Sequence, residues 1–353
     1  MNEQSRWPWR RVAPARYRQL LLLIAVWFGT GTASAIVGTP PDSNGVDSPW
    51  AGVGSLSIGN GVFTGTLIAP DLVITSAHVV AGAAPASITF NLNFGGELTH
   101  RIAAVEVIVN PGYHGFKGFQ YGGQTDLALV RLREPAPAGV PIYGIYSDEL
   151  PQGAVLNLVG YGATGTGAAG VLRGANAAER HAGQNVADCF AYTVGVDNCG
   201  IAAFVGNGPR AIYLFDFDRP DGSKGLVGGT SLGPEEVTLA TGDSGSPAFV
   251  QVNGQWRIAA INTFVINAGA NARPGVYGTA GGGVLLSGEN GEWVRQHLGP
   301  VSALDAGTVV AESAPAPEFQ AGNYVGAGLL ALAVAVTGRR TWTQIVTTLR
   351  NRT

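Results

Sequence analysis

The chain has 353 residues, of which 53 are glycine, and only 13% of its residues are charged. Abundant glycine without a collagen-like period is typical of an all-β protein with many tight turns. The formal net charge is −3, and no cluster of Lys and Arg lies inside the central part of the chain. These features argue against nucleic acid as a partner.

Residues 1–35 have the pattern of a secretory signal peptide. An apolar run covers residues 20–28, small residues follow it and end in Ala33-Ser34-Ala35, and five arginines precede it: Arg6, Arg10, Arg11, Arg16 and Arg18. A basic region, a short apolar core and an A-x-A site predict export and cleavage by signal peptidase. An uncleaved N-terminal anchor is the alternative, although a membrane span needs about 20 apolar residues.

Residues 36–300 are predicted to form one β-rich domain. Short apolar or alternating runs, separated by Gly, Pro, Asn and Asp, each have the length of a strand: 61–68, 72–75, 87–94, 102–109, 127–132, 154–159 and 258–264. Regular strand spacing favours a sandwich or barrel over a βαβ fold. We expect long loops in the Gly- and Ala-rich region 162–235 and a short closing helix at 292–298.

The two cysteines, Cys189 and Cys199, show no metal-ligand spacing. In an exported protein they are expected to form one disulfide that closes a short loop. Two free buried thiols are the alternative. The sequence predicts no particular metal ligand and no cofactor, and it leaves metal binding open. The histidines outside the motifs described below lack ligand spacing and are expected to be surface or structural residues: His100, His114, His181 and His297.

The C-terminal part resembles the sorting tails of bacterial surface proteins. An Ala/Pro-rich linker at 301–320 is followed by a segment, 321–353, with an apolar stretch at 324–337 and then Arg339-Arg340. As a helix the stretch reaches about 21 Å, short of the roughly 30 Å hydrocarbon core. Pro317-Glu318-Phe319 departs from the Pro-Glu-Pro motif of exosortase substrates. A sorting enzyme is therefore one expected partner, and a plain membrane anchor or a soluble helix is the alternative.

Three motifs supply the parts of a nucleophilic hydrolase. A serine needs a base to accept its proton, and that base needs a carboxylate to orient it. His78 follows the apolar run 72–75, Asp126 precedes the run 127–132, and Ser244 lies between Gly242-Asp243 and Gly245. The N–H groups of Gly242 and Ser244 are candidates to bind the oxyanion. Each motif alone is weak, but in this order they indicate a catalytic triad.

The motifs resemble those of the trypsin/chymotrypsin family. The matching segments are Ser76-Ala77-His78, Asp126–Leu129, Gly242–Gly245, Gly65–Ile68, Gly160-Tyr161-Gly162, Pro274–Tyr277 and Trp293-Val294. The resemblance covers residues 36–300. It implies two six-stranded antiparallel β-barrels with a short C-terminal helix. It also implies an exported serine endopeptidase, located in the periplasm, at the cell surface or outside the cell, that acts on proteins or peptides.

The resemblance also implies a way of activation. Mature chains of the family begin Ile-Val-Gly, and here Ile36-Val37-Gly38 directly follows Ala35. Removal of the signal peptide would expose the Ile36 amine, which would pair with Asp243. No separate zymogen cleavage is then needed.

Several positions depart from the family pattern. Val79 and Thr64 replace one cysteine pair, and Ala240 replaces another cysteine. The pocket position that carries a carboxylate in trypsin corresponds to Thr238. The other pocket residues are expected to be Thr263, Phe264, Val265 and Gly275. A neutral pocket narrowed by valine predicts small or medium apolar P1 side chains, unless Glu235 or Glu236 enters it.

Three other functions are each compatible with part of the sequence. A non-catalytic surface-binding module on the same barrel fold would not need a complete triad. An α/β-hydrolase esterase has the order Ser, Asp, His and a G-x-S-x-G motif, whereas this chain has Ser246 at the last glycine. A structural surface protein would explain the tail but not the triad.

Overall fold

The computed structural model describes residues 34–37, 39–115, 123–194, 207–223, 225–267 and 273–298. The chain divides into two units, residues 1–313 and 314–353, and all described residues lie in the first. The predicted linker and tail lie outside the described residues, as does the predicted signal peptide apart from Ser34 and Ala35. No helix in the described ranges is long and apolar enough to cross a membrane.

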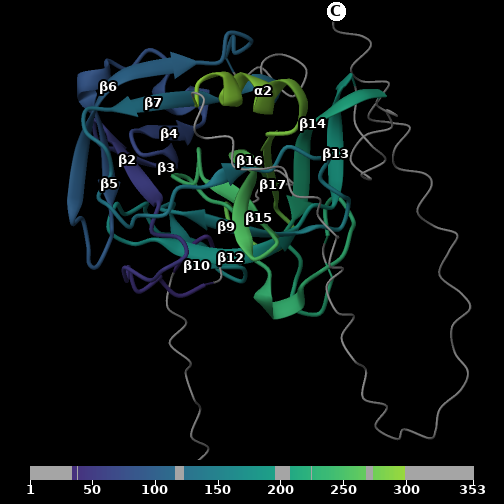
Figure 1. The fold of residues 1–353 in the computed structure, drawn as a ribbon. Helices are drawn as coiled ribbons and strands as arrows, with labels where there is room; N and C mark the ends of the chain where they lie inside the picture. The colour runs from purple at the N-terminus through teal and green to yellow at the C-terminus, as the bar shows by residue number, and fades with distance from the viewer. Residues whose placement is uncertain are drawn as a thin grey trace, which may run out of the picture. The chain divides into compact units, whose positions relative to one another are not determined.

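The first half of the domain is a closed antiparallel barrel (Figure 1). Its strands follow one another in the order β2-β3-β4-β7-β6-β5. The predicted strands at 61–68, 72–75, 87–94, 102–109 and 127–132 all fall on strands of this barrel. The six are β2 (Val53–Ile58), β3 (Gly61–Ala69), β4 (Leu72–Thr75), β5 (Ile88–Leu92), β6 (His100–Val109) and β7 (Ala128–Leu132).

The second half is an eight-stranded sheet in the order β12-β9-β15-β16-β17-β14-β13, with β8 paired to β16. Its strands are β8 (Gly144–Ile145), β9 (Val155–Gly160), β12 (His181–Val186), β13 (Cys189–Val194), β14 (Asn207–Asp216), β15 (Pro247–Val252), β16 (Gln255–Ile266) and β17 (Ala280–Leu285). A small sheet joins β1 (Ser34–Ala35), β10 (Thr164–Thr166) and β11 (Gly170–Arg173). The all-β prediction is confirmed.

The six strands from β12 to β14 stand where the second barrel was expected, but in the described residues they belong to an open sheet that also contains β8 and β13. The Asn185 side chain connects the two outer strands of these six, β12 and β14, which are not paired with each other. The Asn185 amide on β12 donates to the carbonyls of Asp216, 2.8 Å away, and Val237, 2.6 Å away. The long loops expected in 162–235 are found in the described part of 217–235, which contains no strand, whereas β10 to β14 interrupt the earlier part of the region.

The apolar runs of β4 and β7 are continuous because both faces of these strands are buried. Successive side chains point to opposite faces of a strand. Val73 and Val130 pack in the core of the first barrel. Ile74 and Leu129 pack instead in a cluster with Phe249 and other residues of the second half. This second cluster holds the two halves together.

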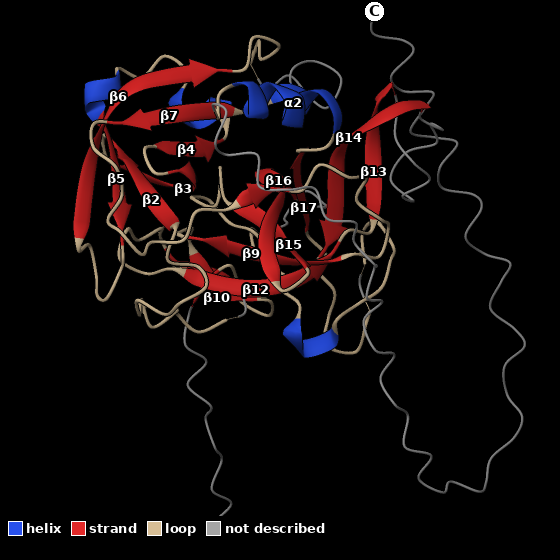
Figure 2. Ribbon diagram, in the orientation of Figure 1, coloured by secondary structure: helices blue, strands red, loops and turns tan. Residues whose placement is uncertain are grey.

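Helices occupy few residues (Figure 2). The described residues contain α1 (Ala77–Val80), directly after β4, and α2 (Gly288–Gln296), which overlaps the helix predicted at 292–298. Short 3-10 turns cover Pro85–Ser87, Gly123–Thr125 and Gly233–Glu235. α2 spans the junction of the two halves, since Asn290 donates to the carbonyl of Gln124, 2.9 Å away.

Arg180 is a fully buried cation that connects three separate segments. Its guanidinium pairs with Asp42, with 3.0 Å between Nη2 and Oδ2, and it donates to the Ser48 hydroxyl at 3.2 Å. It also reaches the carbonyls of Val53 and Asn93, each 3.4 Å away. Burial alone would raise the pKa of Asp42, but the Ser48 hydroxyl and Arg180 hold it below its ordinary value.

The replacement Arg180→Met is expected to lower the free energy of unfolding by about 3–5 kcal/mol, because it leaves a partly buried carboxylate without its partner. Urea denaturation of an inactive form would measure the loss. Arg173→Met is the control, since Arg173 pairs with Glu179 at an exposed site and should lose no more than about 1 kcal/mol. Equal losses in the two variants would contradict the role assigned to Arg180.

Candidate active site

Strand pairing brings His78 and Asp126 to the same edge of the first barrel. β4 and β7 are antiparallel neighbours, with Thr75 opposite Ala128. His78 lies three residues beyond Thr75 on α1, and Asp126 lies two residues before Ala128. The chain leaves β4 and enters β7 at the same end of the barrel, so the two side chains meet there.

Asp126 holds His78 through two hydrogen bonds. The backbone N–H of His78 donates to Oδ1 at 2.8 Å, and Nδ1 lies 2.6 Å from Oδ2. Asp126 is fully buried, whereas 28% of the His78 side chain is exposed. Because a carboxylate only accepts, Nδ1 carries the proton, and Nε2 of the neutral ring is left as an acceptor. This orientation is the one a general base requires.

Ser244 lies in a tight turn next to the His78 segment. Gly242 has φ +102° and Gly245 has φ +84°, conformations that favour glycine. The carbonyl of Asn262 accepts from the Ser76 hydroxyl at 3.1 Å and from the Gly245 N–H at 2.9 Å. One carbonyl therefore ties the residue two before His78 to the residue after Ser244.

Ser244 is half-buried, and its backbone carbonyl accepts a hydrogen bond from the Thr64 N–H at 3.1 Å. Within the part of the chain that the structure describes, no hydrogen bond joins Ser244 to His78. Such bonds are often long in substrate-free enzymes and tighten when substrate binds. The structure thus brings the His78–Asp126 pair together directly and the serine to the neighbouring loop.

The Asp243 carboxylate is buried behind the Ser244 turn. It accepts from the N–H groups of Gly162, at 2.8 Å, and Ala240, at 2.9 Å, and also from the backbone N–H of Ile36. Burial raises the pKa of Asp243 to about 7, although these three bonds oppose the rise. A Cβ at Gly160 or Gly162 would lie 2.1 or 2.4 Å from this carboxylate. The glycines of the Gly160-Tyr161-Gly162 motif therefore leave room for Asp243.

Thr64 and Val79 stand at the two positions where the family pattern has a cysteine pair, and Thr64 makes hydrogen bonds there. Thr64 is fully buried, and its hydroxyl donates to the Gly242 carbonyl at 3.0 Å and accepts from the Tyr161 N–H at 3.1 Å. Val79 and Ala240 are buried apolar residues. Thr64 thus fastens β3 to the nucleophile turn through polar contacts.

Asn262 is the residue that sequence reasoning missed. Besides its carbonyl, its side-chain amide donates to the Ser246 hydroxyl at 2.8 Å, and its Oδ1 accepts from the Tyr213 hydroxyl. These contacts also explain why Ser246 is accommodated where glycine is usual. The available signal was a polar residue inside the apolar run 258–264.

The proposed pocket residues lie mainly on two buried segments. Thr238 and Thr263 are buried, Phe264 is half-buried, and Val265 is 39% exposed. The strand that pairs with 264–266 is β17, beginning at Ala280. Gly275 is not on β17 and lies beside Val37. A Cβ added at Gly275 would be 2.9 Å from the Val37 Cγ2.

Glu236 is turned toward the acidic group described below, where it accepts from the backbone N–H of Asp218 at 2.6 Å. Cys189 is buried on β13, whereas Cys199 lies outside the described residues, so the disulfide stays a prediction.

One group of carboxylates has an arrangement that can hold a metal ion. Asp216, Asp218 and Glu236 are buried, and each offers an oxygen within 4.8 Å of the others. Burial, together with the charge of Asp216, raises the pKa of nearby Asp188 to about 8 and that of Asp218 to about 7. This group is separate from the triad motifs.

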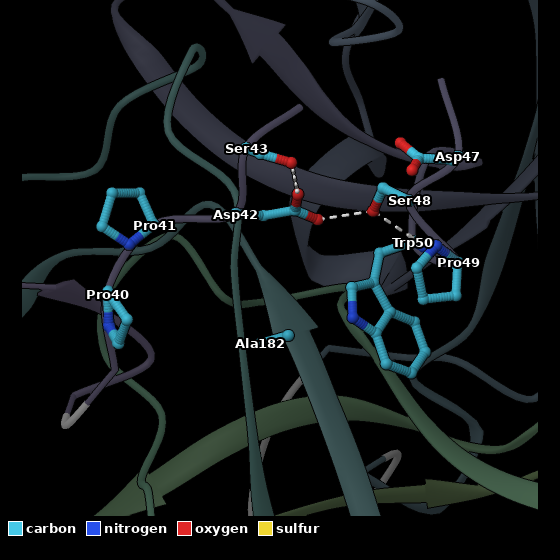
Figure 3. Close-up of a pocket in the computed structure, with 9 residues that line it drawn as sticks. All are labelled: Pro40, Pro41, Asp42, Ser43, Asp47, Ser48, Pro49, Trp50 and Ala182. Carbon is cyan, nitrogen blue, oxygen red and sulfur yellow. Dashed lines mark hydrogen bonds between the residues drawn. The ribbon is translucent and has the colours of Figure 1, made fainter. Parts of the chain in front are cut away.

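A surface cavity of about 360 Å³ lies beside Asp42 and Ser48 (Figure 3). Its wall also includes Pro40, Pro41, Ser43, Asp47, Pro49, Trp50 and Ala182. None of these is a triad residue. The two polar groups nearest Arg180, Asp42 and Ser48, are already bonded to each other, with 2.6 Å between their oxygens.

Two comparisons bear on identity. No curated protein matches the chain significantly. Residues 63–261 match the model of a family described as "Trypsin-like peptidase domain". The match covers more than half of the chain and includes His78, Asp126 and Ser244. The closed barrel, the second β-sheet and the short helices are in agreement with it. The chain therefore belongs to the family of trypsin-like peptidase domains.

Proposed function

We propose that the chain is a serine endopeptidase with His78, Asp126 and Ser244 as its catalytic triad. The observation that carries the proposal is the His78–Asp126 pair, in which a buried carboxylate orients the ring through Nδ1 and leaves Nε2 free to act as a base. In this mechanism the Ser244 hydroxyl attacks the substrate carbonyl carbon and transfers its proton to Nε2. The ring then protonates the leaving amine, and water releases the acyl group by the same steps.

The N–H groups of Gly242 and Ser244 are the proposed oxyanion donors. In a trans peptide the N–H and the preceding C=O point in opposite directions. The Thr241 carbonyl accepts from the Ala163 N–H at 2.7 Å, and the Asp243 carbonyl accepts from the Ser246 N–H at 2.9 Å. Both N–H groups therefore point away from these neighbours and have no acceptor among the described residues.

Activation is proposed to follow cleavage between Ala35 and Ile36. Two observations support this step. The backbone nitrogen of Ile36 already contacts the Asp243 carboxylate, and Ile36 has φ +48°, which is unfavourable for a β-branched residue. Cleavage by signal peptidase would relieve that strain and convert the amide into an ammonium group. The resulting ion pair would hold the Gly242–Ser244 backbone in place.

The substrates are proposed to be proteins or peptides with small or medium apolar P1 residues. Thr238 and Thr263 offer no charge, and Val265, which the sequence comparison predicts to narrow the pocket, is partly exposed. The Glu236 carboxylate accepts hydrogen bonds from the backbone N–H groups of Asp218 and Leu232. It is therefore directed away from Thr238, which supports a neutral pocket. Export, membrane contact through residues 321–353 and processing of that tail by a sorting enzyme are further proposals from the sequence.

Ser244→Ala is expected to reduce peptide hydrolysis by about 10⁴-fold or more and to abolish labelling by a fluorophosphonate, because it removes the nucleophile. Ser87→Ala is the control, because Ser87 is an exposed serine at the end of the 3-10 turn Pro85–Ser87, and this variant should keep the label. Peptide mapping of the labelled protein would identify the site. A folded wild-type chain that takes no label would favour the non-catalytic binding module.

The mature enzyme is expected to begin at Ile36 and to lose activity as pH rises above about 8. A free α-amino group titrates near pH 8, and pairing with Asp243 raises its pKa, so the ion pair is complete below that pKa and is lost above it. N-terminal sequencing and a pH profile of kcat/KM would test this. A variant with one extra residue before Ile36 should be nearly inactive. Full activity in that variant would refute the activation step.

Val265→Gly is expected to increase kcat/KM for peptides with large apolar P1 residues by about tenfold or more relative to those with alanine, because it widens the pocket. A P1 peptide library would measure the ratio. Val105→Gly is the control, as Val105 is a comparably exposed strand valine on β6. A wild-type profile dominated by P1 arginine would contradict the neutral pocket.

A further inference from the structure

Three buried carboxylates meet at one end of the second half of the domain. Asp216 ends β14, Asp218 follows two residues later, and Glu236 lies just after the 3-10 turn Gly233–Glu235. Their side chains are 2%, 5% and 4% exposed, and one oxygen of each lies within 4.8 Å of the others. Buried like charges repel one another unless a cation or protons compensate them.

Asp216 and Glu236 accept hydrogen bonds from the surrounding loop. Asp216 Oδ2 accepts from the N–H groups of Val227, at 2.9 Å, and Gly228, at 3.2 Å. Glu236 Oε2 accepts from the Ser231 hydroxyl at 3.1 Å and the Leu232 N–H at 2.9 Å. The loop between β14 and Glu236 thus folds around the carboxylates.

One oxygen in the group is the exception. Asp218 Oδ1 is buried and has no hydrogen-bond partner among the residues that the structure describes. Across the described ranges, the salt bridges of the domain involve none of the three acids. A buried carboxylate oxygen without a donor is costly, and its lone pairs are available to a metal ion.

We propose that Asp216, Asp218 and Glu236 bind one calcium ion. The donor set is entirely oxygen, without His or Cys, which favours a hard cation over zinc. Ca²⁺ bonds to oxygen at about 2.3–2.6 Å, so two ligands on opposite sides of the ion are roughly 4.6–5.2 Å apart. The three oxygens lie within 4.8 Å of one another, so one ion of this size can contact all three. Mg²⁺ demands a smaller and more regular octahedral site.

The ion would stabilise the segment that supports the N-terminus. Glu236 is followed by Val237 and Thr238, and the Thr238 carbonyl accepts from the Val37 N–H at 3.0 Å. The Asp216 carbonyl accepts from Asn185, which bridges β12 and β14. Calcium therefore links the end of β14 to the backbone behind Ile36 without contacting the triad.

Calcium binding to the full chain carrying Ser244→Ala tests the proposal without autolysis. After removal of metals with EDTA and dialysis, isothermal titration with CaCl₂ should show one site, and saturating Ca²⁺ should raise Tm by several degrees. Equal concentrations of MgCl₂ should give a smaller shift. No calcium binding and no shift would overturn the proposal. This readout does not depend on peptidase activity, so it is independent of the proposed function.

Asp218→Asn in the same background locates the ion. It removes one charge at the residue whose Oδ1 has no hydrogen-bond partner, so the fold should persist while calcium affinity falls about tenfold or more. Asp221→Asn is the matched control, because Asp221 is an exposed acid three residues further along that accepts from the Ser223 N–H. Equal calcium affinity in the two variants would overturn the assignment. If Asp218→Asn does not fold, Glu236→Gln is measured against the same control.

Discussion

The candidate active site depends on the main-chain carbonyl of Asn262. It accepts one hydrogen bond from Ser76, just before α1, and another from Gly245, just after Ser244. His78 belongs to the first barrel and Ser244 to the second half, so their relative position is set at the contact between the two halves. The mixed core cluster, with Ile74 and Leu129 on one side and Phe249 on the other, keeps that contact rigid. Side-chain bonds of Asn262 to Ser246 and Tyr213 fix the carbonyl in turn.

Close packing around Asp243 adds a second constraint. Its carboxylate occupies space that only glycine can leave free at positions 160 and 162, and it receives three backbone N–H groups. One of these comes from Ile36. The conformation of the Ser244 turn is thereby coupled to the N-terminal segment, and a change from amide to ammonium at Ile36 would strengthen an existing contact. Thr64 adds a further link from β3 to Gly242.

Buried charge is handled in two different ways in this domain. Arg180 and Asp42 compensate each other, and the remaining donors of the guanidinium reach carbonyls and a hydroxyl. Among the described residues, the donors to Asp216, Asp218 and Glu236 are neutral, and Asp218 Oδ1 receives none. The first arrangement is complete within the protein. The second leaves negative charge that a divalent cation would neutralise.

The sequence alone determined the all-β class, most strands of the first barrel and the motifs around His78, Asp126 and Ser244. It could do so because β4 and β7 have both faces buried, and because glycine and aspartate at a tight turn leave a local signature. The tertiary structure decided the strands within 162–235, which bury Phe190, Tyr213 and Phe215 together with polar residues such as Asn185. It also decided the role of Asn262 and the meeting of Asp216 and Asp218 with Glu236. These features depend on contacts between residues far apart in the chain, and a single sequence carries no periodicity or spacing that reports them.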